Sequence, residues 1–392
     1  MTHYMNLWDD SFCAIKEGWK TIEMRLNDEK RSIINVGDCI EFTNTTTQEK
    51  MSCIVVNIHG YPNFAELFKN HCKISIGYKE EEKANPDDML KYYTTEQIEK
   101  YGVVGIELAR KKSMIFQYVD GIKYKMGAKF DFSFLKKYGT VFKVFDDQDS
   151  GNICFGINGD KGKIFVKFAG APTAEYEGNT YDAIKRLKGT LPVYRDIKHD
   201  SLIKLITAEE IDNGFALVYE WADGKCMGRM YEDDHRFIMA LPVKEKLSIF
   251  DTVISFLQSV HNSGYVAVDF YDGSIMYDED THKTTICDID FFHKKPYVND
   301  MGRMWGSARF MSPEEYELGA PIDEITNVFT LGQMGFSLFT DSNRDVEVWP
   351  LSMERYKVLE KATDPDREKR YSSIMEFKKA WGKKAWDTAK IE

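Results

Sequence analysis

The sequence predicts an α+β protein built from two domains. The chain has 392 residues, which is more than one hydrophobic core usually serves, and 43% of them are apolar. Residues 1–112 carry short runs of strand-forming residues around a helical stretch. From about residue 139, three strand-like runs come first and long amphipathic stretches follow. A small α/β domain, followed by a larger domain with a β-rich lobe and a helical lobe, accounts for this pattern.

The first domain, 1–112, is predicted from three strand-like runs. These runs are GDCIEFTN at 37–44, MSCIVVNIHG at 51–60 and VVGIELAR at 103–110. NFAELFKNH at 63–71 spaces its apolar residues as a helix does, and the polar segment 78–93 is typical of a loop that enters a helix. We place the seam after the last strand at the polar residues 111–114, KKSM.

The second domain is predicted at 139–392, after a linker or N-terminal extension at 113–138. Its β-rich lobe covers about 139–220, and its helical lobe covers about 221–392. Turn-forming DQDSG and GDKG separate three strand-like runs and favour an antiparallel meander: TVFKVFDD at 140–147, NICFGING at 152–159 and KGKIFVKFAG at 161–170. Helices are predicted where apolar residues recur every three to four positions: 180–195, 243–263, 323–340 and 371–388.

Charge and cysteine content narrow the classes of function. The formal net charge of −11 gives the chain no general attraction to nucleic acid or to anionic membranes. The seven cysteines are scattered and form no pair of CxxC motifs, which is typical of free thiols in a reducing compartment. No apolar run approaches the roughly 20 residues of a membrane span, and the first residues lack the features of a signal peptide. We therefore expect a cytoplasmic protein with no membrane partner.

Two aspartates and a lysine form the candidate chemical core. Asp269 and Asp290 each follow a strand-like apolar segment, so the two carboxylates can meet at one cleft. One carboxylate can orient an attacking hydroxyl and accept its proton, while the other holds Mg²⁺ on the phosphates of ATP. Lys167 stands in the apolar run KIFVKF, where its ammonium group needs an anion. Taken singly, Lys167 also fits an edge-strand lysine, and each aspartate also fits a loop cap.

The order of these residues resembles that of protein kinases. GYVAVDFYDGSIMYD at 264–278 resembles the catalytic loop G-x-x-H-R-D-L-K-x-x-N-I-L-L-D without gaps, which places Asp269 at the catalytic aspartate. IDFF resembles the D-F-G motif, with Asp290 as the Mg²⁺ ligand. GSARFMSPEE resembles the end of an activation segment, with Glu314 as the A-P-E glutamate. DPDREKR resembles the late D-P-x-x-R motif, in which Arg370 is expected to pair with Glu314.

The resemblance covers roughly 130–392 and implies a bilobal protein-kinase-like fold. It further implies ATP and Mg²⁺ as cofactors and a hydroxyl of a protein or small molecule as acceptor. Besides Lys167, it assigns ATP binding to the phosphate-covering loop and to the hinge that contacts adenine: Ser150, Gly151, Asn152, Glu220, Trp221 and Ala222. Asp182 is the best-spaced acidic partner for Lys167 on the following helix, and Glu175 and Glu177 are the alternatives.

Several positions depart from the family pattern. Ala267 and Val268 replace the His and Arg before the catalytic aspartate, and Tyr271 replaces the lysine after it. Without that arginine, phosphate on an activation loop has no usual acceptor, so we expect constitutive or differently gated behaviour. Ser274 replaces the metal-binding asparagine, and its hydroxyl is a weaker ligand for a second Mg²⁺. The phosphate-covering loop also carries three acidic residues close to the expected ATP site: Asp146, Asp147 and Asp149.

The N-terminal domain has a charged motif of its own. In GWKTIEMRL, Lys20, Glu23 and Arg25 alternate with apolar residues, so their charges converge on one patch. The segment resembles the G-x-K-x-x-E-x-R signature of the ASCH domain, a small PUA-like β-barrel, over 1–112. The resemblance implies a cleft for RNA or a nucleotide-like ligand, lined by Lys20, Thr21, Glu23 and Arg25. Alternatively, Glu23 and Arg25 form a solvated ion pair on a strand.

Three functions remain open at this point. The leading one is a Ser/Thr-type protein-kinase-like phosphotransferase fused to an ASCH domain, which transfers the γ-phosphoryl group of ATP to a hydroxyl. The second is a nucleotide-binding pseudokinase scaffold, which the altered catalytic loop favours. The third is a small-molecule kinase, because RLKGTLPVYRDI at 186–197 resembles a step of aminoglycoside phosphotransferases. The SPEE segment argues against the third, since in the protein kinase family it shapes a peptide platform.

Overall fold

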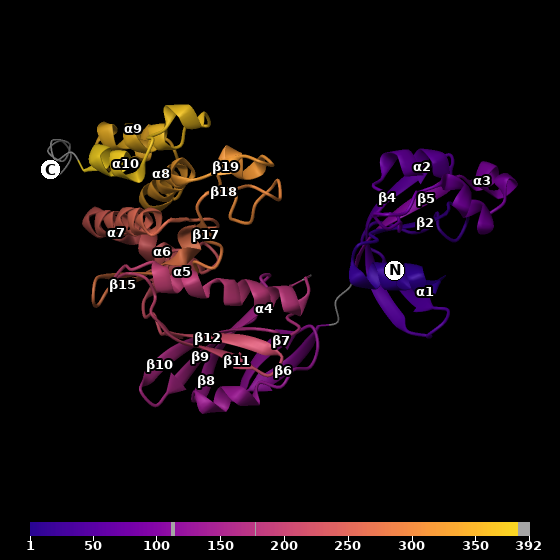
Figure 1. Ribbon diagram of the computed structural model, residues 1–392, viewed down its shortest axis with the longest axis horizontal. Helices are drawn as coiled ribbons and strands as arrows, with labels where there is room; N and C mark the ends of the chain where they lie inside the picture. Colours follow the sequence, from indigo (N-terminus) through magenta and orange to yellow (C-terminus); the bar gives the residue numbers. More distant parts are fainter. Residues whose placement is uncertain (111–113, 177, 383–392) are drawn as a thin grey trace. The chain divides into compact units, whose positions relative to one another are not determined.

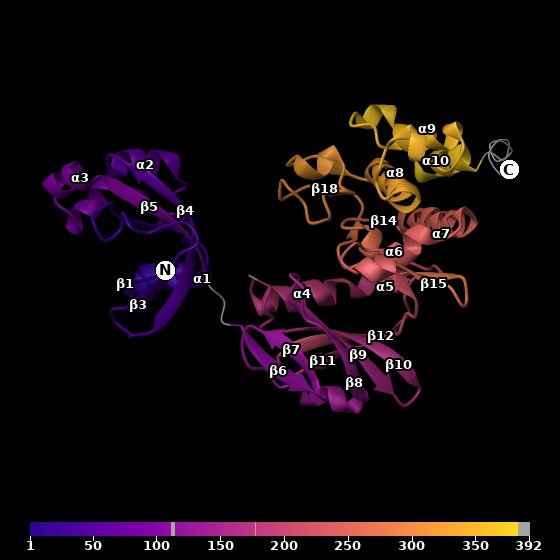
Figure 2. The ribbon, with the colours of Figure 1, turned by 180° about the vertical axis from the view of Figure 1, so that it is seen from behind.

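The computed structural model describes residues 1–110, 114–176 and 178–382. It divides the chain into two compact units, Met1–Met114 and Ile115–Glu392. Figures 1 and 2 show the elements of each unit from opposite sides. Most of the predicted seam, 111–113, lies outside the described residues, as do Glu177 and the end of the chain from residue 383.

A curled five-stranded sheet forms the first unit, in the order β1-β3-β4-β5-β2. Its strands are β1 (Thr2–Leu7), β2 (Ile22–Leu26), β3 (Cys39–Asn44), β4 (Lys50–Tyr61) and β5 (Val103–Arg110). β1 pairs with β3 in parallel, and the other pairs are antiparallel. The register of β4 against β5 shifts between Val55 and Asn57, and such an irregularity bends a strand. The three predicted strands are therefore β3, β4 and β5, and β1 and β2 complete the sheet.

Short helices cover this sheet: α1 (Asp9–Glu17), α2 (Phe64–Asn70), the 3-10 helix η1 (Pro86–Lys91) and α3 (Thr95–Tyr101). α1 ends at Gly18, whose φ of 90° is the left-handed conformation that glycine adopts without steric cost. The chain reverses there and enters β2, which carries the charged motif. Two apolar clusters, one around Phe12 and Phe42 and one around Leu67 and Ile76, hold the helices on the sheet.

The second unit begins with a hairpin and a five-stranded antiparallel sheet in the order β11-β12-β10-β9-β8. The strands are β8 (Thr140–Phe145), β9 (Asn152–Gly159), β10 (Gly162–Ala169), β11 (Leu205–Ile211) and β12 (Gly214–Glu220). The hairpin is β6 (Ile115–Val119) and β7 (Ile122–Met126), and the 3-10 helix η2 (Ser133–Lys137) follows it. Tyr124 and Phe132 are buried against Phe155 and Phe168 of the sheet. The segment 115–138 is thus part of the hydrophobic core of this unit.

The predicted helical stretch 180–195 forms two helices, α4 (Thr180–Gly189) and α5 (Leu191–Asp196). The break precedes Pro192, which has no backbone N–H to continue a helix but fits its first turn. α4 lies across one face of the β8–β12 sheet (Figures 1 and 2), where Ala183 and Leu187 are buried.

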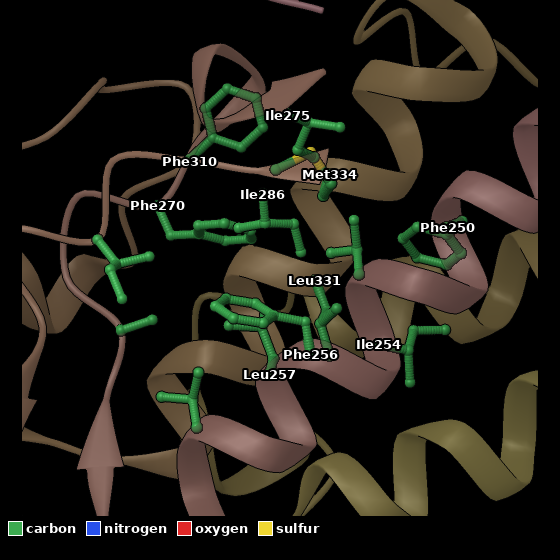
Figure 3. Packing of buried hydrophobic residues seen from close by; sticks show 14 of the residues in the cluster. Phe250, Ile254, Phe256, Leu257, Phe270, Ile275, Ile286, Phe310, Leu331 and Met334 are labelled. Carbon is green, nitrogen blue, oxygen red and sulfur yellow. The ribbon is translucent and has the colours of Figure 1, made fainter. Parts of the chain in front are cut away.

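Five further helices complete the second unit: α6 (Glu232–Ala240), α7 (Val243–Asn262), α8 (Glu324–Thr340), α9 (Met353–Ala362) and α10 (Ile374–Trp381). α7, α8 and α10 correspond to predicted stretches, whereas α6 and α9 were not predicted. α8 is apolar around most of its circumference and is accordingly buried on most sides. Figure 3 shows the core between these helices and the neighbouring loops, where Phe256 lies close to Leu331 and Phe250 belongs to the same apolar cluster.

Short strands and 3-10 helices between α7 and α8 carry the candidate chemical residues. They are β14 (Tyr265–Val266), η3 (Asp272–Ser274), β15 (Ile275–Asp278), β16 (Lys283–Ile286), β17 (His293–Lys294), β18 (Tyr297–Val298), η4 (Pro313–Tyr316) and β19 (Pro321–Ile322). β13 (Lys225–Cys226) joins β15 and β16 in a three-stranded sheet, while η5 (Val346–Val348) and η6 (Arg367–Lys369) flank α9. Within the described ranges, no helix is both long and apolar enough to cross a membrane.

Candidate functional site

A pocket of about 430 Å³ lies in the second unit, where the β8–β12 sheet meets the loops around η3 and β16. Lys167 of β10 and the segment 220–224 line it from the sheet side. Tyr271, Gly273 and Asp288 line it from the loop side. The pocket thus brings together segments that are more than a hundred residues apart in the sequence.

Lys167 is the buried cation of this pocket. It stands in β10, opposite Cys154 of β9, and its side chain is only 9% exposed. Its Nζ donates hydrogen bonds to Asp288 Oδ1 at 2.8 Å and to Asp290 Oδ2 at 2.6 Å. Burial alone would lower the pKa of Lys167, but the carboxylates of Asp288 and Asp290 outweigh it and raise the pKa well above its ordinary value. The lysine is therefore charged and held by two anions.

The two aspartates bound by Lys167 differ in exposure. The side chain of Asp288 is 44% exposed and lines the pocket, whereas that of Asp290 is 5% exposed and lies behind it. Burial raises the pKa of Asp290, and the Lys167 ammonium opposes that rise. The sequence analysis gave the metal-ligand role to Asp290. Of the two carboxylates that contact Lys167, Asp288 is the one among the residues that line the pocket.

The sequence contains a signal that identifies Asp288 as a candidate carboxylate. β16 ends at Ile286, so Asp288 is the first acidic residue after a buried strand, the position at which the sequence argument sought a carboxylate. Its φ of 56° is in the left-handed region, which is rare for a residue with a side chain and recurs at functional sites. The resemblance of IDFF to D-F-G instead placed the sequence assignment two residues downstream, at Asp290.

Asp269 follows β14 and shares this unusual backbone conformation, with a φ of 55°. Burial raises the pKa of its carboxyl to about 7, and the nearby charges of Asp288 and Asp149 contribute to the rise. Gly306 lies against it, since a Cβ added to that glycine would stand 3.7 Å from the Asp269 Cα. A carboxyl group that titrates near neutral pH can accept a proton from a hydroxyl at the pH at which it works.

The residues after Asp269 occupy contrasting positions. Tyr271 lines the pocket, and burial raises the pKa of its phenol far above the ordinary value, so it is neutral. Ser274 is fully buried, and its Oγ has no hydrogen-bond partner among the described residues. The structure therefore does not bring the predicted second metal ligand to the pocket. Asp272, also buried, forms an ion pair of 2.8 Å with Arg309 of the segment before η4.

The phosphate-covering loop is directed toward α4 rather than into the pocket. Gly151 is buried, and a side chain there would collide with Tyr176 and Ala183. Arg186 of α4 donates a hydrogen bond of 2.5 Å to the carbonyl oxygen of Ser150. The three predicted tip residues, Ser150, Gly151 and Asn152, are absent from the pocket lining, and Gln148 of the same loop is present there.

Two of the acidic residues in that loop are engaged by Lys125 of the β6–β7 hairpin. Asp146 accepts a hydrogen bond of 2.6 Å from the Lys125 backbone N–H, and Asp147 forms an ion pair of 2.5 Å with its Nζ. Glu175 pairs with the same Nζ at 2.6 Å. Of the three aspartates expected near ATP, Asp149 is the one whose charge acts on Asp269.

The predicted hinge residues do line the pocket. Glu220 ends β12, and Trp221 and Ala222 follow it as part of the same wall. The Trp221 indole packs edge-on against Phe142 with ring centroids 5.0 Å apart, and its Nε1 donates to Asp223 Oδ1. An aromatic and apolar wall of this kind suits a flat, planar ring.

The acidic partner predicted for Lys167 on the following helix is not there. Asp182 lies in the first turn of α4 and is exposed, and Glu175 pairs with Lys125. Glu177 lies outside the described residues. The partners that contact Lys167 come from the segment after β16 instead, since the chain leaves β16 close to Lys167 and brings two acidic residues within reach.

Glu314 and Arg370 meet in a buried ion pair. Arg370 Nη1 and Nη2 donate to Glu314 Oε1 and Oε2 at 2.7 Å and 3.0 Å, a bidentate geometry. Thr326 of α8 also donates to Glu314 Oε1 at 3.1 Å, and the Arg370 guanidinium lies 4.8 Å from the ring centre of Phe329. The pair ties η4, which follows the 306–312 segment, to α8 and to the segment before α10.

In the first unit, the charged motif forms a buried network. Glu23 Oε2 pairs with Lys20 Nζ at 2.8 Å, and Glu23 Oε1 pairs with Arg25 Nε at 2.8 Å. The side chains of Glu23 and Arg25 are only 5% and 19% exposed, so this ion pair is largely buried and not solvated on a strand surface. Burial raises the pKa of Glu23, but Lys20 and Arg25 outweigh it and hold the pKa below its ordinary value.

This network carries one more positive than negative charge. Lys20 Nζ also donates to Ser11 Oγ at 3.2 Å, and Arg25 Nη2 donates to the carbonyl oxygen of Asn6 at 2.8 Å. Thr21 is fixed by its backbone N–H, which donates to the Ser75 carbonyl oxygen. Two cations, one anion and hydroxyl groups favour an anionic ligand, such as a phosphate group.

Neither unit holds a preformed metal cage. Within residues 1–110, 114–176 and 178–382, no group of three or more His, Cys, Asp or Glu side chains is arranged to hold a metal ion. Mg²⁺ commonly needs only one or two protein carboxylates, because phosphates and water complete its coordination. The half-exposed carboxylate of Asp288 fits that requirement, and Asp290 is the less accessible of the two.

Comparison with known proteins separates the two parts of the chain. Residues 5–111 match the family model described as the ASCH domain. Over 154 residues the chain is 25% identical to the serine/threonine-protein kinase PksC of Streptomyces coelicolor, a match that covers 37% of this chain and 27% of that relative. The chain thus spans about a quarter of that relative's length. A crystal structure of the hypothetical protein PH0355 matches 28% of this chain over its own full length at 30% identity, with a TM-score of 0.25.

Proposed function

Residues 5–111 are an ASCH domain, and we propose that the rest of the chain is an ATP-dependent phosphotransferase of the protein-kinase type that phosphorylates a hydroxyl group. One set of observations carries the proposal: Lys167 and the half-exposed Asp288 line one pocket with an aromatic wall, and the charges of both act on Asp269, the carboxyl whose pKa burial raises to about 7. These are the groups that phosphoryl transfer from ATP requires. The partial similarity to a protein named as a serine/threonine kinase supports the same class.

Each group has a role in this proposal. The adenine ring binds beside Trp221 and Ala222, and Lys167 holds the phosphates. Asp288, in place of Asp290, is the carboxylate for Mg²⁺, which neutralises charge on the transferred phosphate. Asp269 orients the acceptor hydroxyl and takes its proton, a task that suits a carboxyl with a pKa of about 7.

Labelled ATP tests this proposal directly. The full chain is incubated with γ-labelled ATP and Mg²⁺, and label is followed on the chain itself, on generic protein substrates and on a panel of sugars and aminoglycosides. We expect transfer to protein hydroxyls, and a loss of at least about a hundredfold in Asp269→Ala and Asp288→Ala. Asp280→Asn, an exposed aspartate on the turn after β15, is the matched control and should retain full transfer.

The pseudokinase alternative makes the opposite prediction for the same experiment. Two observations favour it: Tyr271 stands in the pocket where the family carries a lysine, and Ser274 is buried away from it. Tight binding of ATP without transfer to any acceptor would establish that alternative. Transfer to a sugar or aminoglycoside alone would establish the small-molecule kinase.

For the ASCH domain we propose an anionic ligand with a phosphate group, as in RNA or a nucleotide. The buried excess of positive charge around Lys20 and Arg25 supports this. Titration of single-stranded RNA at two salt concentrations should show binding that weakens with salt and with Arg25→Ala. Absent or salt-independent binding would rule RNA out.

A further inference from the structure

We propose that Asp290 is the positioning residue for Lys167 and that it replaces the acidic residue expected on the following helix. The proposal rests on the proposed function, since the position of the lysine matters for the phosphates of ATP. It also has a consequence for regulation. The segment that carries Asp288 and Asp290 fixes the position of Lys167, so the nucleotide site forms without an ion pair between Lys167 and α4.

The first step is that α4 offers Lys167 no anion. Asp182 is the one acidic residue in this helix, and it is exposed in the first turn. The α4 residue whose charge reaches this region is Arg186, which acts on Asp290 and lies 5.8 Å from the ring centre of Phe291. A cation at this place repels Lys167, so the helix cannot be what holds the lysine.

The second step is that Asp290 is placed to hold the lysine and to do little else. Its Oδ2 lies 2.6 Å from Lys167 Nζ, and the two side chains are 5% and 9% exposed. Its Oδ1 is buried and has no hydrogen-bond partner among the described residues. The carboxylate therefore lies within the field of two cations, Lys167 and Arg186, and Asp290 is not among the residues that line the pocket.

The third step concerns what happens when a ligand binds. Asp288 also contacts Lys167, at 2.8 Å, but its carboxylate is half exposed at the pocket. Once that carboxylate turns to a metal ion, a lysine held by Asp288 alone would lose its anchor. With Asp290 behind it, Lys167 keeps one buried anion while its remaining N–H groups face the phosphates. Asp288 is thus free to bind the metal ion, while Asp290 holds Lys167 in place.

Nucleotide affinity tests the proposal. Binding of a fluorescent ATP analogue to the full chain is measured in excess Mg²⁺ for the wild type, Asp290→Asn and Asp182→Asn. We expect Asp290→Asn to weaken binding about tenfold or more, since it releases the lysine, and Asp182→Asn to change it less than about twofold. Asp182→Asn is the matched control, because it also removes a carboxylate, in this case from α4.

A rescue variant separates positioning from general stability. Arg186→Glu combined with Asp290→Asn moves the carboxylate from the loop to the α4 position whose charge acts on Asp290. We expect this double variant to bind the nucleotide analogue more tightly than Asp290→Asn alone. A role for Asp290 in folding only would give no such recovery of affinity among folded proteins.

The outcomes that overturn the proposal are distinct from those that overturn the function. Equal affinity in the wild type and Asp290→Asn refutes the positioning role, whereas a wild type that binds no nucleotide refutes the proposed function. In that second case, and also if Asp290→Asn alone fails to fold, Lys167→Met/Asp290→Asn decides. Stability restored by removing both charges supports the pairing, and a purely additive loss or continued failure to fold refutes it.

Discussion

Asparagine in place of Asp269 is expected to stabilise the second unit at alkaline pH, although it removes the proposed catalytic base. Burial raises the pKa of the Asp269 carboxyl from 3.8 to about 7, and the charges of Asp288 and Asp149 contribute. Ionisation of this carboxyl in the folded protein is therefore costly. An asparagine side chain would have the same shape and no charge to bury, so the substitution avoids the cost.

The sign and size follow from proton linkage. The native state holds the proton of Asp269 up to about pH 7, while the unfolded chain releases it near pH 3.8. Between these values the native state binds more protons, so the free energy of unfolding of the wild type falls as pH rises. The difference between the two pKa values corresponds to about 4 kcal/mol. We therefore expect the free energy of unfolding of Asp269→Asn, relative to that of the wild type, to rise by about 2–4 kcal/mol between pH 4 and pH 8.

Urea unfolding of the full chain at several pH values measures this difference. Unfolding of the ASCH domain serves as an internal reference, because Asp269 belongs to the other unit. Asp280→Asn, on an exposed turn, is the control and should follow the wild type at every pH. Glu315, whose pKa burial also raises to about 7, is present in all three proteins, and its charge adds to the rise at Asp269. A gain by Asp269→Asn that is constant with pH, or largest at pH 4, would refute the reasoning.

Three further outcomes are expected. Arg370→Met leaves the Glu314 carboxylate buried without its bidentate partner, so urea unfolding should show a loss of about 3 kcal/mol or more, and Glu314→Gln/Arg370→Met should recover part of it. Trp221→Ala removes the aromatic wall of the pocket, and calorimetry should show ATP binding weakened roughly tenfold with unchanged unfolding of the ASCH domain. Lys20→Met should reduce RNA or nucleotide binding at the buried charge network, whereas Lys69→Met, an exposed lysine on α2, should not in the same titration.

Local patterns in the sequence identified much of the fold. The strands at 103–110 and 161–170 were found because each carries a short run of apolar residues near turn-forming residues. β1 was missed, since THYMNL mixes polar residues into a strand whose hydrogen bonds come from β3. α6 was missed for a related reason: EDDHRFIMA is mostly charged at its start, and its burial depends on packing against α8.

Contacts within the candidate site could be predicted from the sequence only where both partners belong to recognisable linear motifs. Glu314 and Arg370 were paired through two linear motifs, and the structure brings them together. The partner of Lys167 was not predictable in this way. Asp182 and Asp290 are both acidic, and only the path of the chain after β16 decides which of them reaches the lysine. The same path leaves Asp288 at the pocket and Asp290 in the interior.

The altered positions around Asp269 do not all bear on catalysis. Val268 is buried with Met304, Met311 and Ile322 in an apolar cluster, so it holds the 304–311 segment against the strand that leads to Asp269. A charged arginine at this position could not take this packing role, so Val268 has a structural function of its own. Tyr271 is different, because it lines the pocket and replaces a cation with a neutral phenol. Under the proposed function, Tyr271 is therefore the departure that bears on phosphoryl transfer, because it leaves the pocket without a cation at that position.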